Sequence, residues 1–347
     1  MPKFLVAPPR VLLITVLAAF FAATLVAAPF GFAQQTTPDQ KPGDSQEPAA
    51  TVKANVSVVQ LFFNVKDKHG TLIPNLTKDD FEIAEDGAPQ TVKYFTAESN
   101  LPLTLGILID ASGSQRNVID MEKEVGGAFL KQVLTDKDES FVISFDVTVD
   151  LLQDFTRDVH LLQKALNTVK INTGFVGVGL PGSGGGPVPQ QNSPGTLLYD
   201  AVYLSAHDML AKEVGRKAMV LLTDGQDEGS RLKIKDAIEA AQKADSIVYV
   251  LLCEDRGFYG GIGYNGEYDM KKLTEQTGGR VINVGNKFDK LREAFDQIAT
   301  ELRSQYNIGY TPTNTKLDGS YRKLEIKNKQ NYKIQARSGY YAGKNQD

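Results

Sequence analysis

The sequence predicts an α/β protein with a doubly wound, mostly parallel sheet flanked by helices, and a smaller all-β sandwich built from the N- and C-terminal flanks. Between residues 101 and 304, short apolar runs alternate with amphipathic helical patterns, as in sheets covered on both faces. Before and after that stretch, short β segments are separated by turn signals. Neither flank is long enough to build a good core alone, so we expect the two to pair.

The first flank, residues 55–100, is expected to form the first half of the β domain. Residues 56–65 are rich in β-branched and aromatic side chains, and Asp86-Gly87 is a strong hairpin signal. Residues 305–343 supply the second half. The strands expected there cover residues 306–311, 321–326, 332–336 and 339–341.

The central stretch, residues 101–304, is expected to contain alternating strands and helices. The two segments around Asp146 are expected to form an antiparallel pair. The predicted strands cover residues 103–109, 141–145, 148–153, 218–223, 247–252 and 280–283. The predicted helices cover residues 118–134, 159–169, 197–210, 234–244, 270–277 and 288–304.

The N-terminus has the pattern of a secretory signal peptide. A basic start is followed by an apolar run over residues 11–28, and Gly31 and Ala33 frame a cleavage point before Gln34. Residues 1–33 are therefore read as a signal peptide and residues 34–54 as a flexible linker. The alternative is an uncleaved membrane anchor, because the apolar run is marginally long enough to span. Either way we expect an exported protein, periplasmic or extracellular.

Composition excludes several classes of function. The 347 residues contain 38 basic and 42 acidic side chains, a net charge of −4 that does not suggest nucleic acid or a polybasic membrane contact. The single cysteine, Cys253, can form neither an internal disulfide nor a cysteine-based metal site. Two glycine patterns, starting at Gly177 and Gly261, match dinucleotide-binding spacing without the required strand and helix, so no nucleotide is expected. The loop 172–194 is either functional or disordered.

Oxygen-bearing side chains gather where two apolar strands end. Asp110 closes the first strand and is followed by Ser112 and Ser114, Asp224 closes a later strand, and Thr196 opens a helix. Open α/β sheets hold ligands at the carboxyl ends of their strands. Hard oxygen donors suit Mg²⁺ or Ca²⁺ and not zinc. The alternative is that these residues are ordinary helix caps and turn residues.

Together, Asp110-x-Ser112-x-Ser114, Thr196 and Asp224 resemble the metal-ion-dependent adhesion site (MIDAS) of von Willebrand factor type A (VWA) domains. The resemblance covers residues 101–304, and the flanks resemble a bacterial secreted subgroup of these proteins. It implies that the five residues bind Mg²⁺, with Mn²⁺ or Ca²⁺ as alternatives. It also implies a protein partner whose acidic residue completes the metal's coordination shell.

These features favour an exported, non-enzymatic interaction module. One alternative is a metal-assisted hydrolase or phosphotransferase that uses the same oxygen cluster, and another is an envelope structural protein with a vestigial metal site. No histidine lies near the three motifs, and Ser112 lacks the first glycine of a nucleophile elbow. Both observations count against hydrolysis.

Overall fold

The computed structural model describes residues 58–97, 101–172, 195–253 and 266–344. The expected signal peptide, the linker and most of the loop 172–194 lie outside these residues, as do the two glycine patterns except Gly266. Within the described ranges, no helix has both the length and the apolar character needed to cross a membrane.

The central sheet has six strands in the order β10-β9-β8-β5-β6-β7. All neighbouring strands are parallel except β6 and β7, which form the expected antiparallel pair. In chain order this is the doubly wound arrangement 3-2-1-4-5-6, whose direction of growth reverses between β5 and β8. The strands are β5 (Leu103–Asp110), β6 (Glu139–Phe145), β7 (Val149–Thr156), β8 (Arg216–Thr223), β9 (Ser246–Leu252) and β10 (Val281–Asn283).

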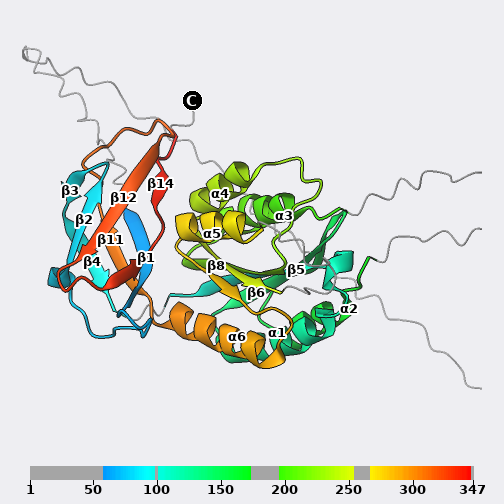
Figure 1. The fold of residues 1–347 in the computed structure, drawn as a ribbon. Coiled ribbons are helices and arrows are strands. Elements are labelled where there is room, and N and C mark those ends of the chain that lie inside the picture. The colour runs from blue at the N-terminus through cyan, green and yellow to red at the C-terminus, as the bar shows by residue number, and fades with distance from the viewer. Residues whose placement is uncertain (1–57, 98–100, 173–194, 254–265, 345–347) are drawn as a thin grey trace, which may run out of the picture. The chain divides into compact units, whose positions relative to one another are not determined.

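Helices cover both faces of this sheet (Figure 1). One face carries α1 (Ile119–Val133), α2 (Val159–Thr168) and α6 (Phe288–Arg303), and their apolar side chains share one core with the strands. The other carries α3 (Leu198–Leu204), α4 (Ile234–Lys243) and α5 (Gly266–Thr277) over a second core. Every residue of β5, β8 and β9 is buried, which explains why these strands read as continuous apolar runs.

The helix expected at residues 197–210 is not uniform. It begins as α3, continues as a π-helical turn over Ser205–Met209 and ends as a 3₁₀ turn over Leu210–Lys212. A repeat of apolar residues predicts that a segment is helical, but it does not predict a local change in winding.

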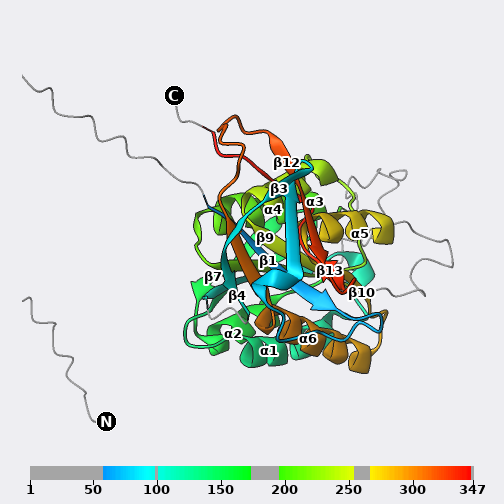
Figure 2. The ribbon, with the colours of Figure 1, turned by 90° about the vertical axis from the view of Figure 1, so that its left-hand side faces the viewer.

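The β domain consists of two four-stranded sheets, in the orders β13-β1-β11-β4 and β14-β12-β2-β3. Each sheet mixes strands from both flanks, which Figure 2 shows as blue and cyan strands among orange and red ones. Both sheets contribute to one core, so the predicted sandwich is confirmed. The strands are β1 (Val59–Lys66), β2 (Phe81–Glu85), β3 (Ala88–Gln90), β4 (Val92–Thr96), β11 (Tyr306–Tyr310), β12 (Tyr321–Asn328), β13 (Lys333–Gln335) and β14 (Gly339–Tyr341).

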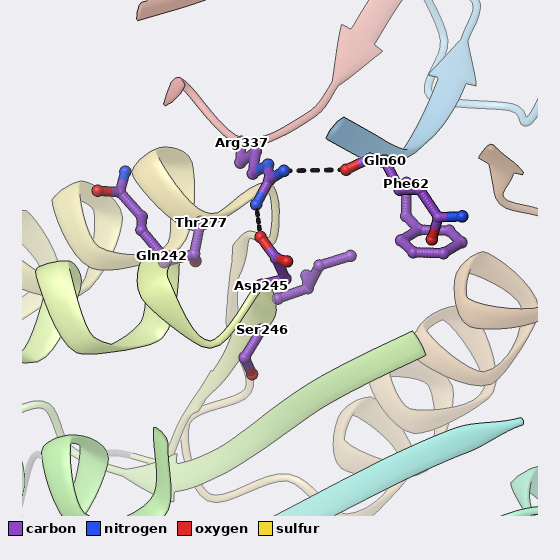
Figure 3. A pocket seen from close by; sticks show the side chains of 8 residues that line it. Gln60, Phe62, Gln242, Asp245, Ser246, Thr277 and Arg337 are labelled. Carbon is purple, nitrogen blue, oxygen red and sulfur yellow. Dashed lines mark hydrogen bonds and ion pairs between the residues drawn. The ribbon is translucent and has the colours of Figure 1, made fainter. Parts of the chain in front are cut away.

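Polar contacts join the sandwich to the α/β part at the amino end of β9. Arg337, between β13 and β14, forms an ion pair with Asp245, which directly precedes β9, and donates to the Gln60 carbonyl at 2.9 Å (Figure 3). Nearby, the Lys66 ammonium lies 2.8 Å from the buried Glu301 carboxylate of α6. Because β9 runs parallel to β8 and β5, this junction lies at the amino ends of the three strands, opposite their carboxyl ends.

Candidate metal centre

Two buried carboxyl groups lie where β5 and β8 end. Asp110 is the last residue of β5 and Asp224 directly follows β8. The register pairs Ile109 with Leu222, so the two acids leave the sheet side by side at its carboxyl edge. Asp110 is 0% exposed and Asp224 is 2% exposed. This is the point where the strand order reverses, and doubly wound sheets bind ligands there.

Hydrogen bonds fix both carboxyl groups. Asp110 Oδ1 accepts from the Ser112 backbone N–H at 2.9 Å, and Oδ2 accepts from the Thr223 hydroxyl at 2.7 Å. Asp224 Oδ1 accepts from the Gln226 backbone N–H at 3.0 Å. The turns that follow the two strands therefore hold these carboxyl groups in place.

The electrostatics of the site favour a bound cation. Burial raises the pKa of Asp110 to about 7, and the neighbouring Asp224 adds to the rise, whereas hydrogen bonds from Ser112 and Thr223 oppose it. A divalent cation bound beside Asp110 would favour its ionised form and would offset the negative charge of the two neighbouring carboxylates.

Two hydroxyl groups stand next to the acids. The Ser112 and Ser114 oxygens are 3.0 Å apart, so the turn after β5 presents them together. Ser112 is 8% exposed, and Ser114 lies in a short 3₁₀ turn over Gly113–Gln115. The structure thus groups both serines with Asp110 and Asp224.

Thr196 reaches the same edge of the sheet from another segment. Its backbone N–H and C=O exchange hydrogen bonds with Glu228, at 2.9 and 3.0 Å, in the loop that follows Asp224. The next N–H, that of Leu197, donates to the Asp146 carbonyl in the turn after β6 at 2.8 Å. Thr196 is therefore anchored between two loops at the carboxyl edge, with its side chain largely buried.

The donor set fits a hard cation. Within the described ranges, no three His, Cys, Asp or Glu side chains are arranged to hold a metal ion together. The candidate site instead offers two carboxylates and neutral hydroxyls, which suits Mg²⁺ because that ion keeps several water ligands.

Sequence reasoning did not single out Thr223 and Glu122. Thr223 follows Leu222, the partner of Ile109, so a correct strand register would have placed its hydroxyl beside Asp110. Glu122 is three residues after Ile119 and three before Val125, a spacing that puts it on the buried face of α1.

The geometry defines a doubly wound α/β domain with an oxygen-rich site at its switch point. Solved structures similar to it include the von Willebrand factor domain of the pili tip protein Mfa5 from Porphyromonas gingivalis, at 13% identity and a TM-score of 0.42 over 59% of this chain and 96% of that one. BatB from Bacteroides thetaiotaomicron matches at 16% identity and a TM-score of 0.43, over 58% of this chain and all of that one.

A third similar structure is proximal thread matrix protein 1 from the mussel byssus, described with a zinc-occupied MIDAS motif. It matches at 13% identity and a TM-score of 0.45, over 62% of this chain, and the match spans about half of that protein (48%). No family model matches this chain, and the search of curated proteins found no match.

Proposed function

We propose that this chain is an exported, non-enzymatic interaction module that recognises an acidic residue of a partner protein through a divalent cation. The cation ligands are Asp110, Ser112, Ser114, Thr196 and Asp224. The observation that carries this proposal is the buried pair of carboxyl groups, Asp110 and Asp224, side by side where the strand order reverses.

Each residue has a distinct part in this proposal. Asp110 and Asp224 supply the negative charge, and the hydroxyls of Ser112, Ser114 and Thr196 supply neutral oxygens. When bound, a divalent cation supplies positive charge and a coordination position that a partner carboxylate can take. Without the cation, the two acids would repel an acidic ligand, so we expect partner binding to require the metal.

The positions of the histidines support binding over hydrolysis. His69 lies in the turn after β1, His160 on α2, and His207 in the π-helical turn after α3. None of these segments carries a proposed ligand, so a metal-assisted hydrolase would lack the commonest general base beside its metal.

Isothermal titration calorimetry with Mg²⁺ tests the cation site. We expect the wild type to bind Mg²⁺ and Asp110→Ala to lose binding while keeping its fold, because Asp110 supplies charge and little apolar packing. Asp120→Ala is the matched control, since the Asp120 side chain on α1 is 97% exposed. Wild-type affinity in Asp110→Ala would remove the assignment of this site.

Capture from an envelope extract tests the partner. The full chain is expected to retain a protein in magnesium and to release it in EDTA. Changing the captured protein's acidic residues to Ala, one at a time, should identify the residue that reaches the metal. Equal capture in EDTA would mean that the partner docks on another surface, with the β domain next to be examined.

Intact-mass analysis tests export. The basic start and apolar run predict a mature protein that begins near Gln34. A mass that retains residues 1–33 would favour the membrane anchor.

A further inference from the structure

A third buried carboxyl group lies near enough to the proposed cation site for Asp110 and Asp224 to act on its charge. Glu122 belongs to α1 and is 0% exposed. It sits among apolar residues of the same helix face, including Ile119, Val125 and Phe129, which pack in the core below the sheet edge. Glutamate is almost never fully buried unless it is paired, so its presence here requires an explanation.

Within the described residues, no nitrogen or oxygen atom hydrogen-bonds the carboxyl group of Glu122, and its hydrogen-bonding neighbour is the Cys253 thiol, a weak donor. The Oε1 atom of Gln115 is buried without a partner, while the Gln115 Nε2 atom lies 3.4 Å from the Ser114 hydroxyl oxygen. An unsatisfied buried polar group costs about 1–3 kcal/mol, and more when it is charged. Native proteins usually resolve such groups with an ordered water or an ion.

The surroundings of Glu122 are acidic. Burial raises the pKa of its carboxyl to about 8, and the charges of Asp110 and Asp224 add to the rise. A hydrogen bond with the Cys253 thiol and the charge of the Lys123 ammonium lower the pKa. The Lys123 ammonium, however, lies 3.8 Å from the exposed Asp120 carboxylate. Asp120 therefore competes with Glu122 for the charge of Lys123.

The three acids are not close enough together to bind one ion directly. No cluster of three acidic, histidine or cysteine side chains within the described ranges could hold a metal. Glu122 is therefore not a direct ligand alongside both Asp110 and Asp224, and any contact with the proposed cation would pass through a water molecule. Mg²⁺ retains several water ligands in protein sites. Protein groups that hydrogen-bond those ligands without touching the metal tune the metal affinity of the site.

We propose that Glu122 is a positioning residue of the cation site, which together with the Gln115 amide hydrogen-bonds water of the cation's hydration shell from the buried side. This inference rests on the proposed function. It gives Gln115 Oε1 a partner and gives Glu122 a stronger one than the Cys253 thiol, and it assigns α1 a part in metal binding that the five ligand residues do not reveal.

The test compares Glu122→Gln with Glu124→Gln, an identical change at an exposed position of the same helix. At pH 8.5, Glu122→Gln is expected to weaken Mg²⁺ binding about tenfold in calorimetry. Loss of a group that hydrogen-bonds a metal ligand typically lowers metal affinity by about 10–100-fold. In EDTA the same variant is expected to melt at a higher temperature than wild type, because it removes an uncompensated buried charge. A purely structural glutamate would not give these opposite effects.

A second variant keeps the charge of Glu122. Gln115→Leu removes the other buried polar group and is also expected to weaken Mg²⁺ binding, whereas Glu124→Gln should leave both the affinity and the melting temperature unchanged. Wild-type affinity in both Glu122→Gln and Gln115→Leu would overturn the inference and leave the proposed function intact. Failure of the wild type itself to bind Mg²⁺ would overturn both.

Discussion

At the scale of single residues, Thr223 holds Asp110 in place from the neighbouring strand. Its hydroxyl donates to Asp110 Oδ2 at 2.7 Å and accepts from the Gly225 backbone N–H at 3.0 Å. The side chain is completely buried. Loss of this hydroxyl would remove both hydrogen bonds and leave a buried carboxyl oxygen without its Thr223 donor.

We therefore predict that Thr223→Val, which preserves shape, lowers the free energy of unfolding by about 1–3 kcal/mol in EDTA. It should also weaken Mg²⁺ binding, because Asp110 loses one of the hydrogen bonds that orient it. Urea denaturation and calorimetry measure the two effects. Thr223→Ser retains the hydroxyl and should stay close to wild type, and equal losses in both variants would contradict this role.

Glu122 makes the stability of the metal-free protein depend on pH. Its pKa rises from an ordinary value of 4.5 to about 8 on folding, so the folded state binds more protons than the unfolded state between these values. Stability is then fully present at low pH and is lost as pH rises toward 8. In EDTA, we predict that wild type loses stability from pH 5 to pH 8.5 and that Glu122→Gln loses less. An equal loss of stability with pH in wild type and Glu122→Gln would exclude this role of Glu122.

At the residue scale, the sequence could predict the strand ends that carry Asp110 and Asp224, because each lies within one segment. Asp110 and Asp224 stand out because each ends an apolar run, and such ends meet at one edge of a parallel sheet. Thr223 and Glu122 could not be assigned in this way. The contact of Thr223 with Asp110 depends on the register of β5 against β8, and the surroundings of Glu122 depend on how α1 packs.

At the scale of elements, the turn between β2 and β3 shows how a local signal fixes geometry. Asp86 and Gly87 have φ values of 48° and 82°, and they join two antiparallel strands in register. Positive φ at both turn residues matches the right-handed twist of a hairpin. Asp-Gly could therefore be read as a hairpin from sequence alone, and the structure confirms it.

Gly87→Ala is predicted to destabilise the protein by about 1–2 kcal/mol, because alanine is strained in the left-handed region. No heavy atom lies within 4 Å of the added Cβ, so the effect would come from the backbone alone. The contrasting variant is Gly126→Ala in α1, where the nearest atom is 3.7 Å away. That change should stabilise by about 0.5–1 kcal/mol. Thermal melts that shift in the same direction for both variants would refute this reading.

At the scale of the whole molecule, the two flanks form one sandwich and leave the candidate site at the opposite edge of the α/β sheet. Pairing of the flanks could be predicted, since neither has a core of its own. The order of the strands could not, because it depends on long-range pairing that no local pattern encodes. In the structure, β11 lies between β1 and β4, and β12 lies between β2 and β14.

This interleaving predicts what truncation does. Removing residues 305–343 would strip β1 of both neighbours and β2 of its β12 partner, exposing strand edges and the aromatic core around Phe63 and Phe81. A chain of residues 55–304 is therefore expected to aggregate, whereas residues 55–343 should be monomeric. Residues 101–304 keep the complete six-stranded sheet, so they should be soluble and bind Mg²⁺. Size-exclusion chromatography and thermal melts distinguish the three chains. A monomeric chain 55–304 with a single cooperative melt would show that the first flank folds without the second.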